Sequence, residues 1–237
     1  MGKLGQQEDL VLYEPPQSIL EALPKVRLRA LVGPSGSGKS TIIDILQKKW
    51  PTKYAQVVGD TTRRPRKGEV DGATYNFRAE EEMIHDLHAR RFLQVVPGSM
   101  GNFYATRPEQ YPANKFAIMA IQARVMEKFQ KLRFKDIKWL LIVPCSDKDW
   151  LRWQESNAQS VQDRKEREAE AIDSYARSLS NPNTYYILND TPENAARRIV
   201  QVDSNRRPDN EILAKQTAIC NLEALKARLA LTHRDNE

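Results

Sequence analysis

The chain has 237 residues, with hydrophobic residues at 40% of its positions and a formal net charge of +6 at pH 7. That length accommodates one domain with a sizeable core, and because no stretch approaches ~18 apolar residues, a membrane-spanning helix is excluded. The positive charge favours anionic partners, but the basic residues are spread along the chain, so we expect no dedicated nucleic-acid surface and no membrane contact.

The two cysteines, Cys145 and Cys220, are far apart in the sequence and lack the spacing of metal ligands. We therefore expect both to be reduced thiols. The N-terminus contains no apolar core of signal-peptide length. Together these features favour a cytoplasmic protein.

The first element is a polar extension, residues 1–25, which prolines interrupt at positions 15, 16 and 24. Residues 18–23 are expected to form a helical turn within it. The apolar run Val26–Val32 then predicts the first strand.

Residues 33–41 read Gly-Pro-Ser-Gly-Ser-Gly-Lys-Ser-Thr and fit the pattern G-x-x-x-x-G-K-[ST]. Glycines let backbone N–H groups turn inward around a polyphosphate, and the positive end of the following helix points toward it. Lys39 is expected beside the β- and γ-phosphates, and the Ser40 hydroxyl suits a magnesium ion. A glycine-rich turn with a chance lysine is the alternative, but the strand before and the helical spacing after the loop count against it.

A second strand is predicted at residues 54–58, and it leads into a basic segment at residues 61–77. Arginines and lysines lie there beside threonine hydroxyls, which makes a second candidate anion site. A solvated basic loop is the alternative. The turn Asp71-Gly72 before a short strand indicates instead that the segment is ordered.

Helical patterns follow at residues 80–90, 122–132, 160–179 and 191–202. The third is rich in charge and is expected to be exposed. Thr191 is the expected N-cap of the fourth, with Pro192 at its first position.

Residues 203–237 form a C-terminal extension, with a linker followed by a predicted helix over residues 210–231. Its apolar side chains are Ile212, Leu213, Ile219, Leu222, Leu225 and Leu229. Either the chain's own core or a second copy must cover this stripe. We favour the core, and the protein is expected to be a monomer or a homodimer.

The phosphate loop taken together with residues 61–77 resembles the guanylate kinase family. In that family the loop has the form G-P-S-G-x-G-K-[ST]. A later segment has the form T-T-R-x-P-R-x-G-E-x-x-G-x-x-Y-x-F, and this chain fits it at every fixed position. Weaker similarities bring the coverage to residues 28–202.

The resemblance implies an α/β fold: a P-loop three-layer core with a parallel sheet, a small mixed-sheet insertion that binds a nucleoside monophosphate, and a helical lid. The family domain would span residues 26–202. The monophosphate region would lie at residues 59–110 and the lid at residues 147–170.

The resemblance also implies roles for individual residues. Arg63 and Arg66 would hold the acceptor phosphate, and Arg164 in the lid would reach between the two nucleotides, with Arg167 one helical turn on as the second choice. The expected catalytic residues are Lys39, Arg63, Arg66 and Arg164. The residues expected to bind ATP are Gly33, Ser35, Gly36, Ser37, Gly38, Lys39, Ser40, Thr41 and Asn189, with Ser40 also on Mg²⁺. Those expected to bind the monophosphate are Arg63, Arg66, Tyr75, Gln94, Tyr104 and Thr106.

The chain departs from the family pattern where the base and the metal are bound. Gln94 and Gly59 replace a glutamate and a serine that help to read guanine. Ala120 and Gln122 replace two acids that help to order magnesium and the acceptor base. We consider Asp60 a candidate for a replacement carboxylate.

Two functions fit this pattern. The first is an ATP- and Mg²⁺-dependent phosphotransferase that converts GMP to GDP. The second is a catalytically weak guanylate kinase-like module that binds a nucleotide or a phosphopeptide. The intact loop favours the enzyme, because a domain that no longer uses ATP has no chemical need for Lys39 and Ser40.

Overall fold

The computed structural model describes residues 13–21, 23–66, 68–98, 101–157 and 160–234. They form two compact units. Unit 1 draws on Met1–Leu28, Lys53–Met119 and Glu127–Ile137, and unit 2 on Arg29–Thr52, Ala120–Met126 and Lys138–Glu237.

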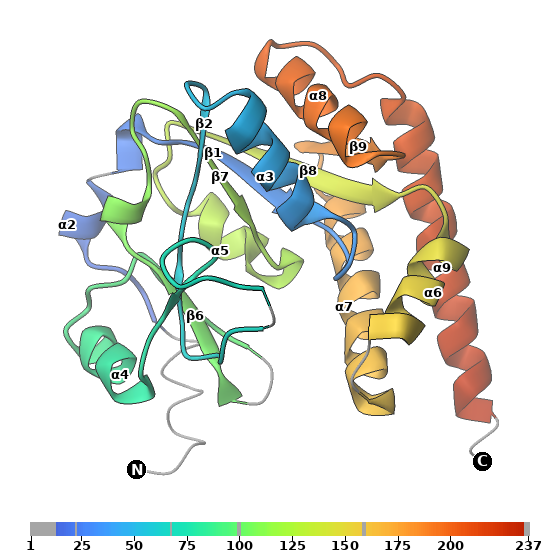
Figure 1. Ribbon diagram of the computed structural model, residues 1–237, viewed down its shortest axis with the longest axis horizontal. Coiled ribbons are helices and arrows are strands. Elements are labelled where there is room, and N and C mark those ends of the chain that lie inside the picture. Colours follow the sequence, from blue (N-terminus) through green and yellow to red (C-terminus); the bar gives the residue numbers. More distant parts are fainter. Residues whose placement is uncertain (1–12, 22, 67, 99–100, 158–159, 235–237) are drawn as a thin grey trace. The chain divides into compact units, whose positions relative to one another are not determined.

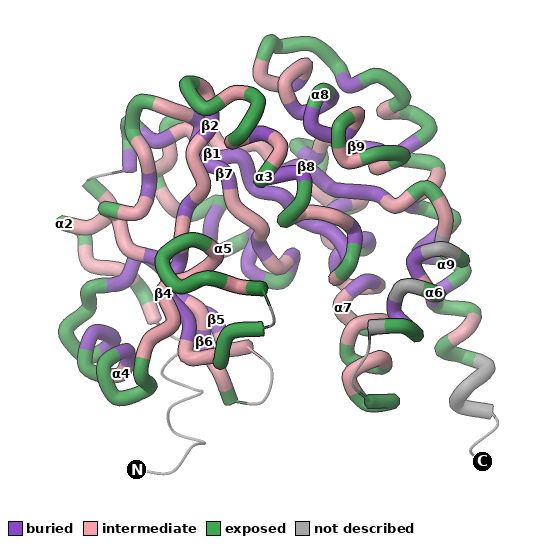
Figure 2. Tube along the Cα trace, viewed as in Figure 1, coloured by how far each residue is buried: buried purple, intermediate pink, exposed green. Residues whose placement is uncertain are grey.

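A five-stranded parallel sheet has the strand order β2-β7-β1-β8-β9 (Figure 1). Its strands are β1 (Arg27–Val32), β2 (Tyr54–Gln56), β7 (Phe116–Ala120), β8 (Asp136–Pro144) and β9 (Thr184–Asn189). The segments Leu28–Val32 and Leu140–Val143 are buried at every residue (Figure 2). Continuous burial is expected when helices cover both faces of a parallel sheet.

Unit 1 contains a separate four-stranded mixed sheet in the order β4-β3-β6-β5. Its strands are β3 (Asp60–Thr61), β4 (Asn76–Phe77), β5 (Gln94–Pro97) and β6 (Phe103–Thr106). β3 pairs with β4 in parallel, while β6 pairs with β3 and β5 in antiparallel fashion. Met83 and Leu87 of helix α4 (Glu80–His88) join a buried cluster with Phe92 and Phe103. The two sheets confirm the expected α/β fold with a mixed-sheet insertion.

Further short elements lie within residues 17–130 of the described chain. They are α2 (Gln17–Leu20) and the 3-10 turns η1 (Leu23–Lys25), η3 (Pro108–Gln110) and η4 (Ala123–Val125), followed by α5 (Met126–Gln130). The prediction of a single helix over residues 122–132 is therefore wrong, because a 3-10 turn and a five-residue helix occupy this segment. Its apolar side chains are buried as expected, but Val125, Met126 and Phe129 need little more than one helical turn to face the core.

Unit 2 contains the long helices. They are α3 (Lys39–Lys49), α6 (Asp147–Asn157), α7 (Val161–Ser180), α8 (Pro192–Asp203) and α9 (Glu211–Arg234). The Oγ1 atom of Thr191 accepts a hydrogen bond from the backbone N–H of Asn194 at 3.2 Å, which confirms the predicted N-cap of α8. α8 packs against α3 and β9. Among the described helices, none combines the length and apolar character that crossing a membrane requires.

Helix α7 is not the exposed helix that its charge predicts. Ala171, Ser174, Tyr175 and Ser178 are buried, and α7 packs against α9. Alanine and serine do not form a recognisable apolar stripe, so the buried side of α7 could not be identified from the sequence.

Helix α9 is covered on one side. Leu222 and Leu225 are buried, as expected for packing against the chain's own core. Ile212 and Leu213, however, are 78% and 51% exposed, and Ile219 and Leu229 are each 39% exposed. The prediction that the core covers the whole stripe is wrong for these four side chains.

Candidate functional site

The loop between β1 and α3 is built on glycines that no other residue could replace without strain. Gly33, Gly36 and Gly38 have positive φ angles of 134°, 80° and 90°. A Cβ atom on Gly33 would lie 2.6 Å from the carbonyl oxygen of Ile142, and one on Gly38 would lie 2.5 Å from Nδ2 of Asn189. Gly38 caps α3 without a side-chain hydrogen bond. The first N–H groups of α3 are therefore left for an anion.

Lys39 lies in the first turn of α3 and folds back over the loop. Its Nζ donates hydrogen bonds to the carbonyl oxygens of Gly33 and Pro34, both at 2.7 Å, and lies 3.5 Å from Oγ of Ser37. Burial of the ammonium lowers the pKa of Lys39 to about 8, although Glu170 acts in the opposite direction. A desolvated cation among carbonyl oxygens gains strongly from an arriving phosphate.

The last strand of the parallel sheet supports the same loop. Nδ2 of Asn189, at the end of β9, donates to the carbonyl oxygen of Ser37 at 2.8 Å. Its Oδ1 is buried and has no hydrogen-bond partner among the described residues. Asn189 therefore lies at the loop and supports its backbone.

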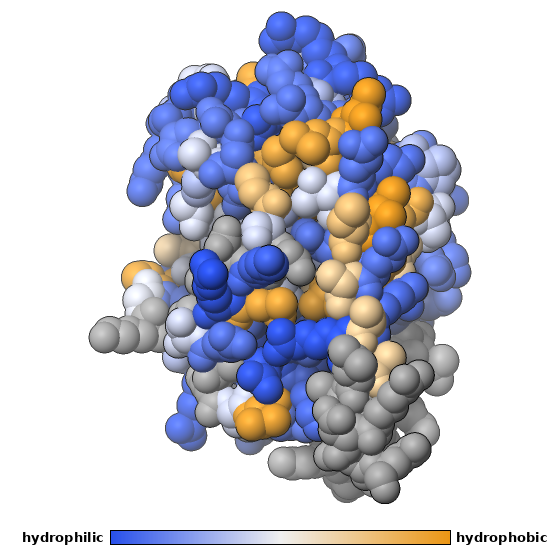
Figure 3. All heavy atoms as spheres, turned by 90° about the vertical axis from the view of Figure 1, so that its right-hand side faces the viewer, coloured by the Kyte–Doolittle hydropathy of each residue, from blue (hydrophilic) through white to orange (hydrophobic). Residues whose placement is uncertain are grey.

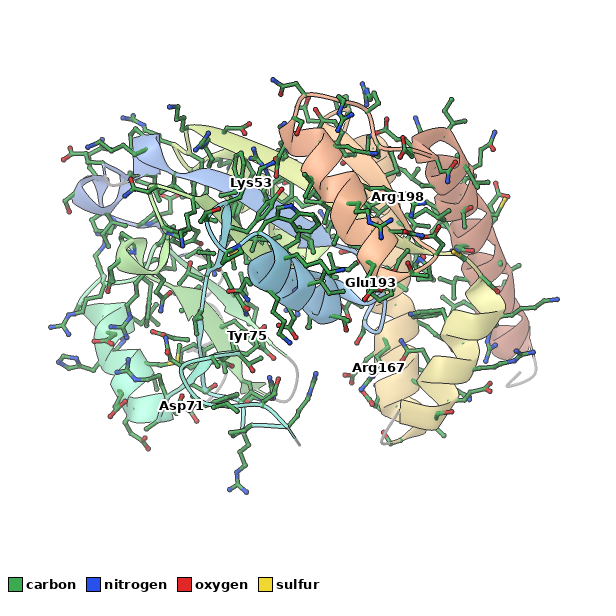
Figure 4. All side chains as sticks on the ribbon, turned by 45° about the horizontal axis from the view of Figure 1, so that its top comes forward. Lys53, Asp71, Tyr75, Arg167, Glu193 and Arg198 are labelled. Carbon is green, nitrogen blue, oxygen red and sulfur yellow. The ribbon has the colours of Figure 1, made fainter. Side chains whose placement is uncertain are left out.

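Arg198 fixes the turn that follows Asn189. It donates to both carboxylate oxygens of Asp190, at 2.6 and 2.9 Å, and to the carbonyl oxygen of Leu188 at 2.7 Å. Hydrogen bonds from Arg198 hold the pKa of Asp190 well below its usual range. Figure 4 shows Arg198 on α8, which follows this turn.

Helix α6 also contacts the loop, a contact that no motif in the sequence predicts. Nε1 of Trp150 and Nε2 of Gln154 donate to the carbonyl oxygen of Ser35 at 2.7 and 2.9 Å. Figure 4 shows Arg167 on α7. Its Nη1 lies 3.5 Å from Oε1 of Gln154, so α7 is linked to the loop through α6. No motif marks Trp150 or Gln154, since their partner is more than a hundred residues away.

The two candidate lid arginines differ in their surroundings. The Arg167 side chain is 15% exposed, and its Nε donates to Asp163 at 2.9 Å. The Arg164 side chain is 36% exposed and lies 4.0 Å from Glu168. The hydrogen-bonded chain to the phosphate loop therefore runs through Arg167 rather than through Arg164.

In unit 1, Arg63 is held by a carboxylate. Its Nη1 and Nη2 atoms donate to the two oxygens of Glu69 at 2.8 and 2.9 Å. Its Nε donates to the hydroxyl of Tyr104 at 3.2 Å, and its guanidinium carbon lies 5.6 Å from the centres of the Tyr75 and Phe77 rings. Partial burial raises the pKa of Glu69, but the hydrogen bonds from Arg63 and from the backbone of Arg66, together with the charges of both arginines, bring the net pKa below the usual value.

The turn that carries Arg66 is closed by the same glutamate. The backbone N–H of Arg66 donates to Oε2 of Glu69 at 2.6 Å, and the N–H of Glu69 donates to the carbonyl oxygen of Arg66 at 3.0 Å. Arg66 itself is exposed. Arg63 and Arg66 therefore share one ordered turn, as predicted for the basic segment. The Glu69 carboxylate stabilises it by accepting hydrogen bonds from the Arg63 side chain and the Arg66 backbone.

The other residues expected around the monophosphate lie on the mixed sheet and the loop beside it. The rings of Tyr75 and Tyr104 are 5.6 Å apart, and burial raises the pKa of Tyr75 to about 12. Oγ1 of Thr106 lies 2.9 Å from the hydroxyl of Tyr111, and the two groups are hydrogen-bonded to each other. Gln94 pairs with Thr106 across the strands. It is 8% exposed, and its Oε1 has no hydrogen-bond partner among the described residues.

Asp60 does not offer a free carboxylate. Asn76 and Gln110 donate to its Oδ1, both at 2.8 Å, and Arg107 donates to its Oδ2 at 2.8 Å. Arg107 also donates to Asp86 at 2.8 Å. Asp60 is thus part of a buried network of unit 1, and the prediction that it replaces a base-reading carboxylate is wrong.

The side chains that could bind a metal near the phosphate loop suit a magnesium ion that arrives with a nucleotide, rather than a metal ion held by the protein alone. The described residues contain no group of three His, Cys, Asp or Glu side chains that could hold an ion. Mg²⁺ keeps several waters and uses one or two protein ligands together with substrate phosphates. The exposed Ser40 in the first turn of α3 fits that requirement.

Comparison with known proteins supports the same interpretation. The model of the family described as guanylate kinase matches residues 25–203. The guanylate kinase of Chlamydia muridarum is 38% identical over 90 residues, which make up 38% of this chain and 42% of that protein. That of an aster yellows witches'-broom phytoplasma is 28% identical over 177 residues, 73% of this chain and 82% of that protein.

Coverage of the relatives is uneven. The chain spans 42% of the Chlamydia protein and 32% of the guanylate kinase of Helicobacter pylori strain 26695, to which it is 48% identical over 67 residues. A crystal structure of guanylate kinase from Anaplasma phagocytophilum has the same fold, with a TM-score of 0.53 and 20% identity over 76% of this chain and 85% of that chain. Because the family model covers 179 of the 237 residues, this chain belongs to the guanylate kinase family.

Proposed function

We propose that this protein is a nucleoside monophosphate kinase that transfers the γ-phosphoryl group of ATP to GMP. One observation carries the proposal: Lys39 keeps a desolvated ammonium at the mouth of a glycine loop, with carbonyl oxygens as its partners and a pKa lowered to about 8. Such a group is unfavourable in the free protein and becomes favourable when a polyphosphate binds.

The donor site would be the loop of unit 2. The N–H groups of residues 33–41 would surround the β- and γ-phosphates, and Lys39 would neutralise their charge. Asn189 would use its buried Oδ1 to accept a hydrogen bond from the nucleotide. Mg²⁺, held by Ser40 and the phosphates, would withdraw negative charge from the transferring group when it is bound.

The acceptor site would be the surface around Arg63 in unit 1. Arg63 and Arg66 would hold the monophosphate, because a planar guanidinium can donate to two phosphate oxygens at once. The hydroxyls of Tyr75 and Tyr104 would add donors, whereas that of Thr106 is buried and hydrogen-bonded to Tyr111. The buried Oε1 of Gln94 could accept the N1–H of guanine while its amide N–H₂ donates to O6.

The chemistry requires positive charge and alignment more than a strong base. A phosphate acceptor is already ionised at neutral pH, so the protein must bring two anions together in line and exclude water. Arg164 or Arg167 would add the last positive charge from α7. The link from Arg167 through Gln154 to the loop favours Arg167 for this role.

The test is a coupled assay with ATP, Mg²⁺ and each nucleoside monophosphate in turn. We expect ADP formation that depends on GMP and is lost in Lys39→Met. The control is Lys48→Met, which removes an exposed lysine from the same helix. A folded protein that turns over no monophosphate at high enzyme concentration would rule out the kinase.

The alternative function is a binding module for a nucleotide or phosphopeptide. It is favoured by the replacement of the two family acids by Ala120 and Gln122 and by the exposure of Arg66. Calorimetry with GMP and with a phosphoserine peptide separates the two, because only the module should bind the peptide.

A further inference from the structure

Basic residues mark the amino ends of four neighbouring strands of the parallel sheet. Lys53 directly precedes β2 (Figure 4), and Lys115 directly precedes β7. Arg27 is the first residue of β1, and Lys135 directly precedes β8. The strand order β2-β7-β1-β8 makes these four ends neighbours (Figure 1), and all four residues belong to unit 1. Because adjacent strands lie about 4.8 Å apart, the four positions form a row about 14 Å long.

Contacts between the four segments support this row. The backbone N–H of Phe116 donates to the carbonyl oxygen of Lys53 at 2.8 Å, and that of Lys135 donates to Val26 at 2.9 Å. The guanidinium carbon of Arg27 lies 4.5 Å from the centre of the Phe116 ring, and Nζ of Lys53 lies 5.6 Å from the same centre. Two cations from different segments therefore share one aromatic ring.

Two further cations extend the row beside β8. Lys131 and Arg133 lie in the short connection between α5 and β8, and both are exposed, as is Lys135. Along the chain, the acids within five residues of any of the six basic residues are Glu127 and Asp136. Positive charge therefore exceeds negative charge in these segments.

These cations differ from arginines elsewhere in the protein. Arg29, Arg63 and Arg198 are each paired with a carboxylate. None of the six has an ion-pair partner within the part of the chain that the structure describes. Single surface lysines are ordinary and solvated, but a row of like charges repels itself, and a bound polyanion would remove that repulsion.

The surroundings of the row restrict the kind of anion. The exposed large hydrophobic side chains of the described residues lie elsewhere, at Val70, Val161 and on α9, and Figure 3 shows hydrophobic residues on the side that carries α9. A protein interface normally has an apolar centre, and stable attachment to a membrane needs an apolar or lipid anchor besides charge. Neither partner suits a row of cations alone.

The aromatic rings at this edge are also covered. Tyr54 and Phe116 are only 1% and 8% exposed, so they offer no platform on which the bases of a single strand could stack. The phosphate backbone of a duplex, in contrast, requires only positive charges at suitable positions.

We propose that this basic edge binds the phosphate backbone of double-stranded nucleic acid without reading its sequence. The basic edge consists of Arg27, Lys53, Lys115, Lys131, Arg133 and Lys135. We expected no dedicated nucleic-acid surface because the basic residues are spread along the chain, but the sheet brings these four segments together. The inference does not rest on the proposed kinase activity, since the phosphate loop follows the opposite end of β1.

The experiment measures binding of the full chain to a short labelled duplex of mixed sequence, as DNA and as RNA, by fluorescence anisotropy over a range of salt concentrations. With about five phosphate contacts, the logarithm of the association constant should fall with that of the salt concentration with a slope of about −4. The double variant Lys53→Gln/Lys115→Gln should weaken binding by about tenfold at low salt and reduce the slope by about two.

The control removes the same charge from another place. Lys165→Gln/Lys226→Gln replaces exposed lysines of α7 and α9 and should leave the affinity close to that of the wild type. Lys131→Gln/Arg133→Gln should behave like the first double variant, and it tests the basic edge in a connection if changes beside Phe116 disturb folding. Circular dichroism of each variant measures its folding.

Four outcomes would overturn the proposal. The wild-type chain could bind no duplex at low salt, or the control pair could weaken binding as much as the edge variants, which would assign it to the overall charge of +6. Displacement of the duplex by saturating ATP would place it at the phosphate loop. Tighter binding to a single strand, or to vesicles that contain phosphatidylserine, would assign the edge to another partner.

Discussion

Replacing Lys39 by methionine should stabilise the free protein while it removes phosphoryl transfer. Methionine has nearly the length of lysine and no charge, so it removes the desolvated ammonium and keeps most of the packing. If Lys39 is held for a ligand rather than for the fold, its buried charge lowers the free energy of unfolding of the nucleotide-free protein.

The magnitude follows from the pKa of Lys39, which burial lowers from its ordinary 10.5 to about 8. One pKa unit corresponds to about 1.4 kcal/mol, so the full cost of the buried charge at pH 7 would be about 3 kcal/mol. The side chain is partly exposed, and its hydrogen bonds to two carbonyl oxygens would be lost. We therefore expect Lys39→Met to raise the free energy of unfolding by about 2 kcal/mol.

The same cost predicts a pH dependence with a defined sign. Below pH 8 both the folded and the unfolded protein carry the charged lysine, and the penalty is fully present. Between pH 8 and 10.5 the folded protein releases the proton first. Its free energy of unfolding therefore rises through this window, relative to that of Lys39→Met.

Urea unfolding of the nucleotide-free protein at several pH values measures both effects, with Lys48→Met as the control. That variant removes an exposed lysine near the end of the same helix and should change neither the stability nor its pH dependence. If Lys39→Met unfolds at lower urea than the wild type, or if both respond identically to pH above 8, Lys39 is a structural cation and the reasoning fails.

Four further outcomes can be checked by kinetics, binding and unfolding. Gln94→Glu should raise the ratio of kcat/KM for GMP over that for AMP by at least about tenfold, because a carboxylate accepts from two guanine N–H groups; an unchanged ratio would remove Gln94 from the base site. Arg66→Ala should raise KM for the monophosphate more than KM for ATP, and equal changes would contradict its placement on the acceptor. Arg167→Ala should lower kcat more than Arg164→Ala, since only the former is hydrogen-bonded toward the loop; the reverse order would favour Arg164 as the lid arginine. Thr191→Ala should lower the free energy of unfolding by about 1 kcal/mol through loss of the N-cap, whereas no loss in urea unfolding would show that α8 does not depend on it.

Features that depend on neighbouring residues were predictable from the sequence. The glycine loop, the strand before it and the Thr191 cap each follow from a few adjacent side chains with a strict geometric requirement. Gly33, for example, has no room for a side chain beside Ile142. Such requirements leave a readable pattern because few residues satisfy them.

Features that depend on distant partners were not predictable. The buried pair of Arg29 and Asp203 joins a strand to the end of a helix 174 residues later. A charged residue inside a predicted core strand has no visible explanation until that partner is placed. The hydrogen bonds from Trp150 and Gln154 to Ser35 are missed for the same reason. Asp60 was misjudged because its partners Arg107 and Gln110 lie almost fifty residues later, at the start and the end of η3.

The two candidate sites compensate their positive charges in different ways, and from this difference we predict an order of binding. Among the described residues, Lys39 has carbonyl oxygens at bonding distance, whereas Arg63 already has both oxygens of the Glu69 carboxylate. Glu170 acts on the Lys39 charge only at a distance, so a phosphate that reaches Lys39 would be the first anion at hydrogen-bonding distance among its described partners. A phosphate that reaches Arg63 must compete with Glu69 or share the guanidinium with it. The loop of unit 2 should therefore bind its anion first, and the monophosphate should bind productively once repulsion or rearrangement has loosened the Arg63–Glu69 pair.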